Sequence, residues 1–222
     1  MSHGTTYISP QYNPHSLERD WGFLVWPGYL DGFELDTHGL AALRVRMFDK
    51  IIQSIMSDTR SCVISHSHPA IVNADGLSQN TAQLCRDVGL DILTLALLAD
   101  VPIHRPLTLN HNSLVGHWRW LREVWRHGRD RPAIVCDEAA RQSSELIDAL
   151  TSGKNNLAIA HLRDSFKKVQ STPEDSGAYL SFLYGLTLFC PFIATELLWR
   201  QGRINHAPLR RSGRQENEGT NQ

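Results

Sequence analysis

The stretch G-L-A-A-L-R-V-R-M-F-D-K-I-I-Q-S-I-M, residues 39–56, decides the fold class of this chain. Its apolar residues recur at the three- and four-residue spacing of one helical face, at Leu40, Leu43, Met47, Ile51 and Ile55. Charged residues take the other side of that helix, at Arg44, Arg46, Asp49, Lys50 and Asp58. We predict an amphipathic helix over residues 38–57, with Asp36 or Thr37 as its N-cap.

Helical periodicity continues after this stretch, and almost no segment alternates polar and apolar residues as a half-buried strand would. Gly89 separates two helical patterns, and Pro102 and Pro106 mark a loop before the next one. We predict further helices over residues 78–88, 90–99, 113–127, 137–151 and 155–170. The predicted fold class is therefore all-α, with a single globular helical domain over residues 1–204.

The two ends of the chain differ from this helical body. Residues 1–33 combine three prolines with scattered aromatic residues, which predicts an irregular N-terminal arm with a short helix over residues 16–21. Residues 59–76 have the composition of a connector. Residues 205–222 are polar and lack aromatic side chains, so we predict a disordered C-terminal tail.

The composition is that of an ordinary globular protein. The chain has 222 residues, of which 41% are hydrophobic and 20% are charged, and this length is sufficient for one core. The formal net charge is −1, so binding to a polyanion would need a strongly local basic patch.

The cysteines and the start of the chain indicate a cellular compartment. Four cysteines lie far apart without a C-x-x-C pair, which predicts buried free thiols in a reducing compartment; they are Cys62, Cys85, Cys136 and Cys190. The first residues lack the basic and apolar pattern of a secretory signal. We therefore predict a cytoplasmic location.

A second stretch, H-W-R-W-L-R-E-V-W-R-H at residues 117–127, concentrates tryptophan, arginine and histidine. On a helix over residues 113–127 it forms an apolar seam. The seam consists of Leu114, Trp118, Leu121 and Trp125, flanked by His117, Trp120 and Val124. On the opposite, basic face Glu123 is placed to pair with Arg119. We predict a core helix that ends at Gly128 in a left-handed cap.

The arginines of this helix are the candidate partner-binding residues: Arg119, Arg122, Arg126 and Arg129. Proteins that bind single-stranded nucleic acid present aromatic rings beside basic residues, whereas here the rings and the arginines are predicted on opposite faces. A core helix with a protein-contacting outer face is therefore favoured. Nucleic-acid binding through these residues and Arg131 stays open as the alternative.

Cys62, His66 and His68 form the pattern C-x₃-H-x-H, which contains residue types that bind zinc. No fourth ligand and no second knuckle follows, so a loop with polar histidines is favoured. A zinc-binding protein is kept as a third hypothesis.

Two acidic clusters, D-T-H at residues 36–38 and C-D-E at residues 136–138, invite a search for acid–base chemistry. Both precede predicted helices, where a carboxylate stabilises the helix N-terminus, and this predicts capping roles. The chain has no nucleophile elbow, P-loop, zinc-protease motif or dinucleotide-binding motif. We expect a protein that is not an enzyme, with no catalytic residue, no metal and no cofactor.

Residues 178–195 carry no charge, which raises the question of membrane insertion. Tyrosines, threonines, Gly185 and Pro191 dilute the hydrophobicity of this segment. We predict a core helix over residues 178–199 that is kinked at Pro191, with membrane association as the competing interpretation.

One family resembles this chain in four consecutive features. They are the segment F-E-L-D-T-H-G-L-A-A-L (33–43), the amphipathic helix after it, the segment R-S-C-V (60–63) and the apolar helical pair that follows. That family is the SctK family of type III secretion accessory proteins, which includes YscK-like and NolU-like members. The resemblance covers residues 33–100, about a third of the chain. It implies a helical, non-enzymatic protein of the cytoplasmic sorting platform.

The same resemblance implies the partners. They are an inner-membrane ring protein and an SctQ-like pod protein, between which such an adaptor forms a bridge. Membrane association would then be peripheral and would occur through partners. A nodulation-associated branch of the family is one reading of the resemblance.

Overall fold

The computed structural model describes residues 11–33, 35, 39–56, 70–134 and 142–209, and these ranges confirm the all-α fold class. The helices are α1 (Pro14–Gly28), α2 (Leu40–Ile55), α3 (Thr81–Val88), α4 (Leu90–Leu98), α5 (His111–Arg129), α6 (Ser144–Thr151), α7 (Asn155–Ser171), α8 (Ser176–Leu186) and α9 (Pro191–Arg200). Two short strands complete the described fold, β1 (Val72–Ala74) and β2 (Leu107–Leu109).

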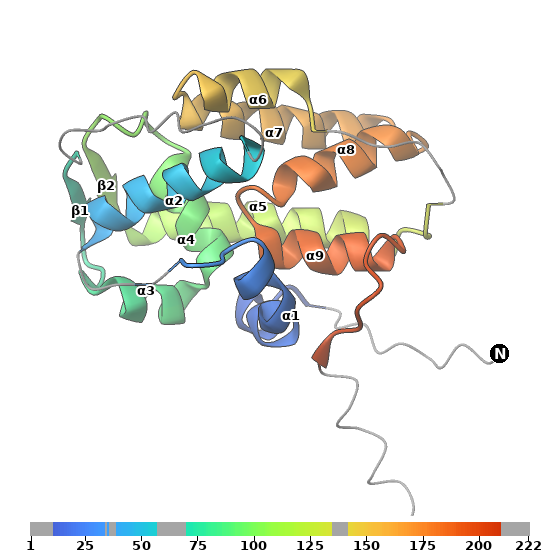
Figure 1. The fold of residues 1–222 in the computed structure, drawn as a ribbon, viewed down its shortest axis with the longest axis horizontal. Coiled ribbons are helices and arrows are strands. Elements are labelled where there is room, and N and C mark those ends of the chain that lie inside the picture. Colours follow the sequence, from blue (N-terminus) through green and yellow to red (C-terminus); the bar gives the residue numbers. More distant parts are fainter. Residues whose placement is uncertain (1–10, 34, 36–38, 57–69, 135–141, 210–222) are drawn as a thin grey trace, which may run out of the picture.

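The helices are arranged around α4. Every residue of α4 is buried, and it packs against α1, α2, α3, α5, α7 and α9. Figure 1 shows α6, α7 and α8 along one edge of the body and α1 at the opposite edge. A helix that is apolar nearly all round has no solvent face, so its neighbours must cover it on all sides. This explains why the most apolar helix lies at the centre.

Arg44 of α2 caps the C-terminal end of α4. Its guanidinium donates hydrogen bonds to four carbonyl oxygens, those of Leu97 at 2.7 Å, Val101 at 2.8 Å, Pro102 at 3.0 Å and Arg105 at 2.7 Å. The last carbonyls of a helix have no hydrogen-bond donors within it. When they are buried, leaving them without a donor costs free energy. The prediction that places Arg44 on the charged side of the helix, opposite the apolar residues, is therefore wrong, because its side chain is buried against the end of α4.

Asn155 of α7 satisfies the same end of α4 from the other side. Its amide donates to the carbonyls of Leu98 at 2.6 Å and Val101 at 3.0 Å, and its oxygen accepts from the Ile103 amide at 2.8 Å. At the N-terminal end of α4, the Glu18 carboxylate of α1 accepts a hydrogen bond from the Leu90 amide. Three surrounding helices thus hold the two ends of α4.

The N-terminal arm is more regular than predicted. Residues 14–28 form α1, in which Trp21 and Val25 are fully buried, so the irregular arm with a helix over residues 16–21 is a wrong prediction. Asn13 caps the helix, and Pro14 occupies its first turn, where a missing amide hydrogen costs nothing. Pro27 lies in the last turn. Pro14 and Pro27 therefore lie in the first and last turns of one helix and do not break it.

The predicted helix over residues 38–57 is present as α2, beginning at Leu40. Its N-cap is Gly39, with φ of 90° and no side-chain capping bond, so the predicted cap at Asp36 or Thr37 is wrong. Residues 36–38 themselves lie outside the described residues.

The predicted helices over residues 90–99 and 155–170 are confirmed as α4 and α7. The helix expected from residue 78 begins at Thr81, after an Asn80 cap. The one expected over residues 137–151 is described only as α6, since residues 135–141 lie outside the described ranges.

The uncharged segment folds as two helices where one kinked helix was predicted. The chain turns back between α8 and α9 (Figure 1), and Pro191 is the first residue of α9. Proline lacks the amide hydrogen that a continuous helix would need, so it starts a new helix instead. In the ranges that the structure describes, no helix is both long and apolar enough to span a bilayer.

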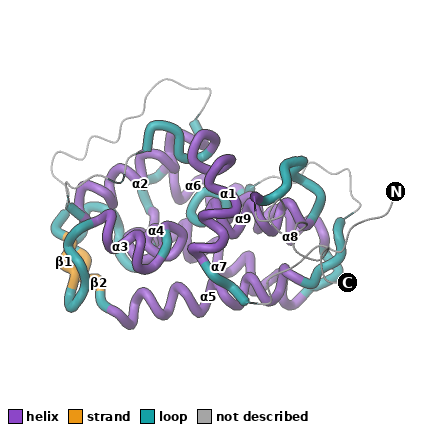
Figure 2. Tube along the Cα trace, turned by 90° about the horizontal axis from the view of Figure 1, so that it is seen from below, coloured by secondary structure: helices purple, strands orange, loops and turns teal. Residues whose placement is uncertain are grey.

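The two strands were not predicted. They pair in parallel, with Val72 opposite Leu107 and Ala74 opposite Leu109, at the end of the body beside α3 (Figure 2). They arise in residues predicted as a connector and as a loop. Three residues are too few for a period-two pattern to be recognised.

Most of the predicted C-terminal tail, residues 210–222, lies outside the described residues. Residues 205–209 are described, and the His206 ring lies edge-on to the ring of Phe23 at 6.2 Å between centroids. The helical body therefore includes the beginning of the predicted tail.

Replacing Leu186 by Asp is expected to unfold or aggregate the protein, because the side chain is fully buried and the new charge would have no partner. Leu157→Asp is the matched control, since Leu157 is 40% exposed. Urea unfolding followed by circular dichroism measures both variants. Equal stability of the two would contradict the placement of α8 in the core.

Replacing Arg44 by Met is expected to lower the free energy of unfolding by about 3 kcal/mol or more, because several buried carbonyls lose their donor. Arg119→Met, on the exposed face of α5, should stay within about 0.5 kcal/mol of the unmodified protein. Chemical denaturation gives both values. A loss at Arg44 no greater than that at Arg119 would refute the capping role.

Candidate functional site

The predicted arginine face lies on α5, and three of its arginines are exposed: Arg119, Arg122 and Arg126. The seam that turns them outward is largely confirmed, since Leu114, Leu121 and Trp125 are buried. Trp118 is only partly buried, and the Arg122 guanidinium lies over its ring at 5.0 Å from the centroid. These three arginines lie where a partner can reach them.

Arg129 and Arg131 have other roles. The Arg129 guanidinium contacts the Asp130 carboxylate at 2.7 Å. The Arg131 guanidinium lies 4.3 Å from the centroid of the Tyr179 ring and donates to the carbonyl of Pro173. Arg129 is therefore a poor member of the predicted face, and Arg131 serves to fix the end of α5 against α8.

Gly128 is not the left-handed cap that was predicted. It lies inside α5, which continues to Arg129. A Cβ atom at Gly128 would collide with the Tyr179 hydroxyl and with the Leu197 methyl groups. The glycine is required for the close approach of α5 to α8 and α9.

A groove of about 660 Å³ runs between α5 and α7, and the exposed arginines lie on α5 outside its lining. Aromatic rings line it, with the Trp120 ring edge-on to Phe166 at 6.1 Å between centroids. The Arg163 guanidinium lies 5.5 Å from the Trp120 centroid and donates to Nδ1 of His117 at 2.9 Å. The groove therefore has an aromatic lining with a cation stacked on it.

The His117 imidazole is buried, with 4% of its surface exposed. Burial, and then the charge of Arg163, lower the pKa of His117 to about 4. At neutral pH the ring is uncharged, so its Nδ1 can accept the hydrogen bond from Arg163. This hydrogen bond holds the guanidinium of Arg163 against a neutral acceptor in the groove.

Polar side chains join the two helices at the rim of the groove. Glu123 accepts a hydrogen bond from the Gln170 amide at 2.8 Å, so its partner is on α7 and the predicted pairing with Arg119 is wrong. Lys167 pairs with Asp164 on the same helix at 2.8 Å. The Glu123 carboxylate thus finds its hydrogen-bond donor on another helix. The residue pattern of α5 alone does not reveal such a contact.

The serine hydroxyl in the lining of the groove has a structural partner. Ser113 is the hydroxyl residue in it, and its Oγ donates to the Asn110 carbonyl as part of the α5 capping box. Among the residues that the structure describes, no three His, Cys, Asp or Glu side chains are close enough to share a metal ion. The zinc candidates Cys62, His66 and His68, and the cluster at residues 136–138, lie outside the described ranges.

Two buried acids hold α9 in place. The Asp91 carboxylate accepts hydrogen bonds from the amides of Phe192 at 3.3 Å and Ile193 at 2.9 Å, and burial raises its pKa to about 8. Glu196 accepts from the Trp21 indole at 2.6 Å and contacts Arg200 at 2.6 Å. These acids have structural partners and do not face the groove.

The two cysteines within the described ranges, Cys85 and Cys190, are buried free thiols as predicted. Burial raises the pKa of Cys85 to about 12 and that of Cys190 well above its ordinary value. A thiol is reactive mainly as its thiolate, so these side chains are inert at neutral pH.

Comparison of the chain with protein-family models and with curated protein sequences gives no match.

His117 makes the stability depend on acidity. Because its pKa is lower in the folded protein than its ordinary value of 6.5, the unfolded state binds the proton first, and stability is lost as the pH falls from 6.5 towards about 4. His117→Gln should reduce this loss, as measured by chemical denaturation across that range. His104→Gln, in an exposed loop, should leave it unchanged. A steep loss retained in His117→Gln would contradict this assignment.

Proposed function

We propose that this protein is a non-enzymatic adaptor of a type III secretion system that works in the cytoplasm. It would bridge an inner-membrane ring protein and an SctQ-like pod protein of the sorting platform. The observation that carries the adaptor role is the α5 surface, where Arg119, Arg122 and Arg126 are exposed on the same helix that forms one wall of an aromatic groove. The resemblance of residues 33–100 to the SctK family supplies the system and the partners.

The chemistry of the groove supports contact with a protein. Interfaces are enriched in tryptophan and arginine, and Trp120, Arg163 and the exposed arginines provide both types here. The groove's own polar groups bond to one another, as His117 does with Arg163. A partner would meet a preorganised surface on which the exposed arginines of α5 lie near the exposed carboxylates of Asp100 and Glu123, which favours a partner face of mixed charge.

Nucleic-acid binding by a regulatory protein is the second candidate. The observation that favours it is the cation–aromatic pairing at Arg122 with Trp118 and at Arg163 with Trp120. The near-neutral chain charge and the reduction of the five-arginine face to three exposed members weigh against it. Phosphate contacts of only three arginines would make such binding weak at physiological salt.

Changing Arg119, Arg122 and Arg126 together to Glu is expected to weaken binding to the ring or pod protein at least tenfold, because reversed charges repel the partner face. The matched control is Arg86→Glu with Arg105→Glu and Lys154→Glu, which has the same charge change on exposed sites outside α5. Binding of the purified proteins is measured by calorimetry, and thermal unfolding verifies that both variants fold.

Unchanged binding in the α5 variant would reject this surface, and no binding to either protein would reject the adaptor role. The nucleic-acid alternative is tested on the same proteins with DNA and RNA at about 0.15 M salt. A complex that the α5 variant loses, and for which the logarithm of the affinity falls linearly with the logarithm of the salt concentration, would favour that alternative.

A further inference from the structure

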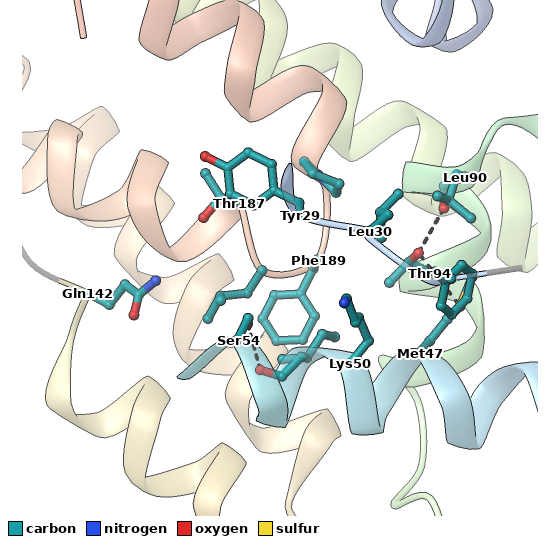
Figure 3. Close-up of a pocket in the computed structure, with 14 residues that line it drawn as sticks. Tyr29, Leu30, Met47, Lys50, Ser54, Leu90, Thr94, Gln142, Thr187 and Phe189 are labelled. Atoms are coloured by element: carbon teal, nitrogen blue, oxygen red, sulfur yellow. Dashed lines mark hydrogen bonds between the residues drawn. The ribbon is translucent and has the colours of Figure 1, made fainter. Parts of the chain in front are cut away.

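A cavity of about 140 Å³ lies apart from the α5–α7 groove, with which it shares no lining residue. It is bounded by the turn after α1, by α2, by the start of α4 and by the loop between α8 and α9, and it is partly open to solvent (Figure 3). Most of its wall is apolar, including Leu30, Phe33, Met47, Ile51, Leu188 and Phe189. None of the contacts described above uses this space.

Three of the hydroxyl groups around the cavity, those of Ser54, Thr94 and Thr187, are bonded to their own helices. Ser54 donates to the Ile51 carbonyl at 2.7 Å, and Thr94 donates to the Leu90 carbonyl at 2.9 Å, as the dashed lines in Figure 3 mark. Thr187 likewise donates to a carbonyl of α8 at 2.7 Å. Since these protons are used within the helices, the hydroxyls offer the cavity little polarity.

Lys50 differs from the other polar residues of the wall. Its ammonium donates to the Asp31 carbonyl at 2.6 Å, which uses one of its three N–H groups. In the part of the chain that the structure describes, no carboxylate forms an ion pair with it. The cavity therefore combines an apolar wall with one cation that has donors to spare.

The size of the cavity limits what can occupy it. An engineered protein cavity of about 150 Å³ lined by apolar side chains holds one benzene molecule. A single six-membered ring therefore matches the space of about 140 Å³. The unneutralised ammonium of Lys50 favours an anionic group on that ring, because a charge-assisted hydrogen bond is stronger than a neutral one.

We propose that this cavity is a binding site for a small aromatic carboxylate of about the size of benzoate. The ring packs between Met47, Ile51 and Phe189, and the carboxylate accepts hydrogen bonds from Lys50. The site does not rest on the adaptor function, because it lies on other elements of the fold.

Benzoate and benzene are the probes, titrated into the full chain with isotope-labelled methyl groups and followed by NMR. Benzoate is expected to cause saturable shifts at Met47, Ile51 and Leu188, and to bind the unmodified protein roughly tenfold more tightly than benzene, as a charge-assisted hydrogen bond predicts. Ser54→Phe, which places a ring at the cavity, should abolish both sets of shifts.

Lys50→Met should lose this roughly tenfold preference for benzoate and keep its benzene affinity. Lys50→Gln, which keeps a donor for Asp31 but lacks the charge, should show the same loss even if the Met variant folds poorly. Lys168→Met, on the exposed side of α7, is the matched control and should bind both compounds as the unmodified protein does.

Three results would overturn the proposal. They are the absence of saturable shifts at the lining residues, equal affinities of the unmodified protein for benzene and benzoate, and full benzoate affinity in both Lys50 variants.

Discussion

The satisfied ends of α4 are the constraint on which the rest of the structure depends. A helix buried on every side cannot leave its terminal amides and carbonyls to water, so other elements must supply their partners. Arg44 and Asn155 bind the carbonyls at one end, and Glu18 accepts from the Leu90 amide at the other. Each comes from a different helix, so the capping of α4 also fixes the positions of α1, α2 and α7 around it. An arginine is suited to this place because burial lowers its pKa only to about 10, and it stays charged at neutral pH.

The same rule extends outward from α4 to α9. Asp91 accepts hydrogen bonds from the first amides of α9, where the helix dipole also favours a negative group. Burial nevertheless raises the pKa of Asp91 to about 8, which shows that desolvation outweighs those two bonds. From the other side of α9, Glu196 binds the Trp21 indole of α1. Buried polar residues therefore link pairs of helices through hydrogen bonds. Hydrophobic burial stabilises the packing of the helices elsewhere in the core.

Helical periodicity predicted α2, α4, α5 and α7, because each has an apolar face or is apolar throughout. Periodicity could not predict the buried capping role of Arg44. The carbonyls that accept its hydrogen bonds are distant in sequence and become partners only when α2 packs against α4. The same limit applies to Glu123. The spacing within one helix predicts a pairing with Arg119, whereas in the folded protein Glu123 accepts a hydrogen bond from Gln170. The exposed arginines of the candidate surface were predictable from α5 alone. The groove and the Lys50 cavity were not, because each needs the relative placement of separate helices.

Arginine residues illustrate what a sequence can and cannot say about the function of this chain. Arg44, Arg131 and Arg119 are chemically identical, yet the first caps a buried helix and the second stacks on Tyr179. Only the third is exposed and belongs to the candidate binding surface. Their roles follow from where unsatisfied carbonyls and aromatic faces lie in the folded chain, and these positions are set by tertiary packing. A basic stretch in a helical protein therefore indicates a binding surface only after the arginines that the fold itself requires have been subtracted.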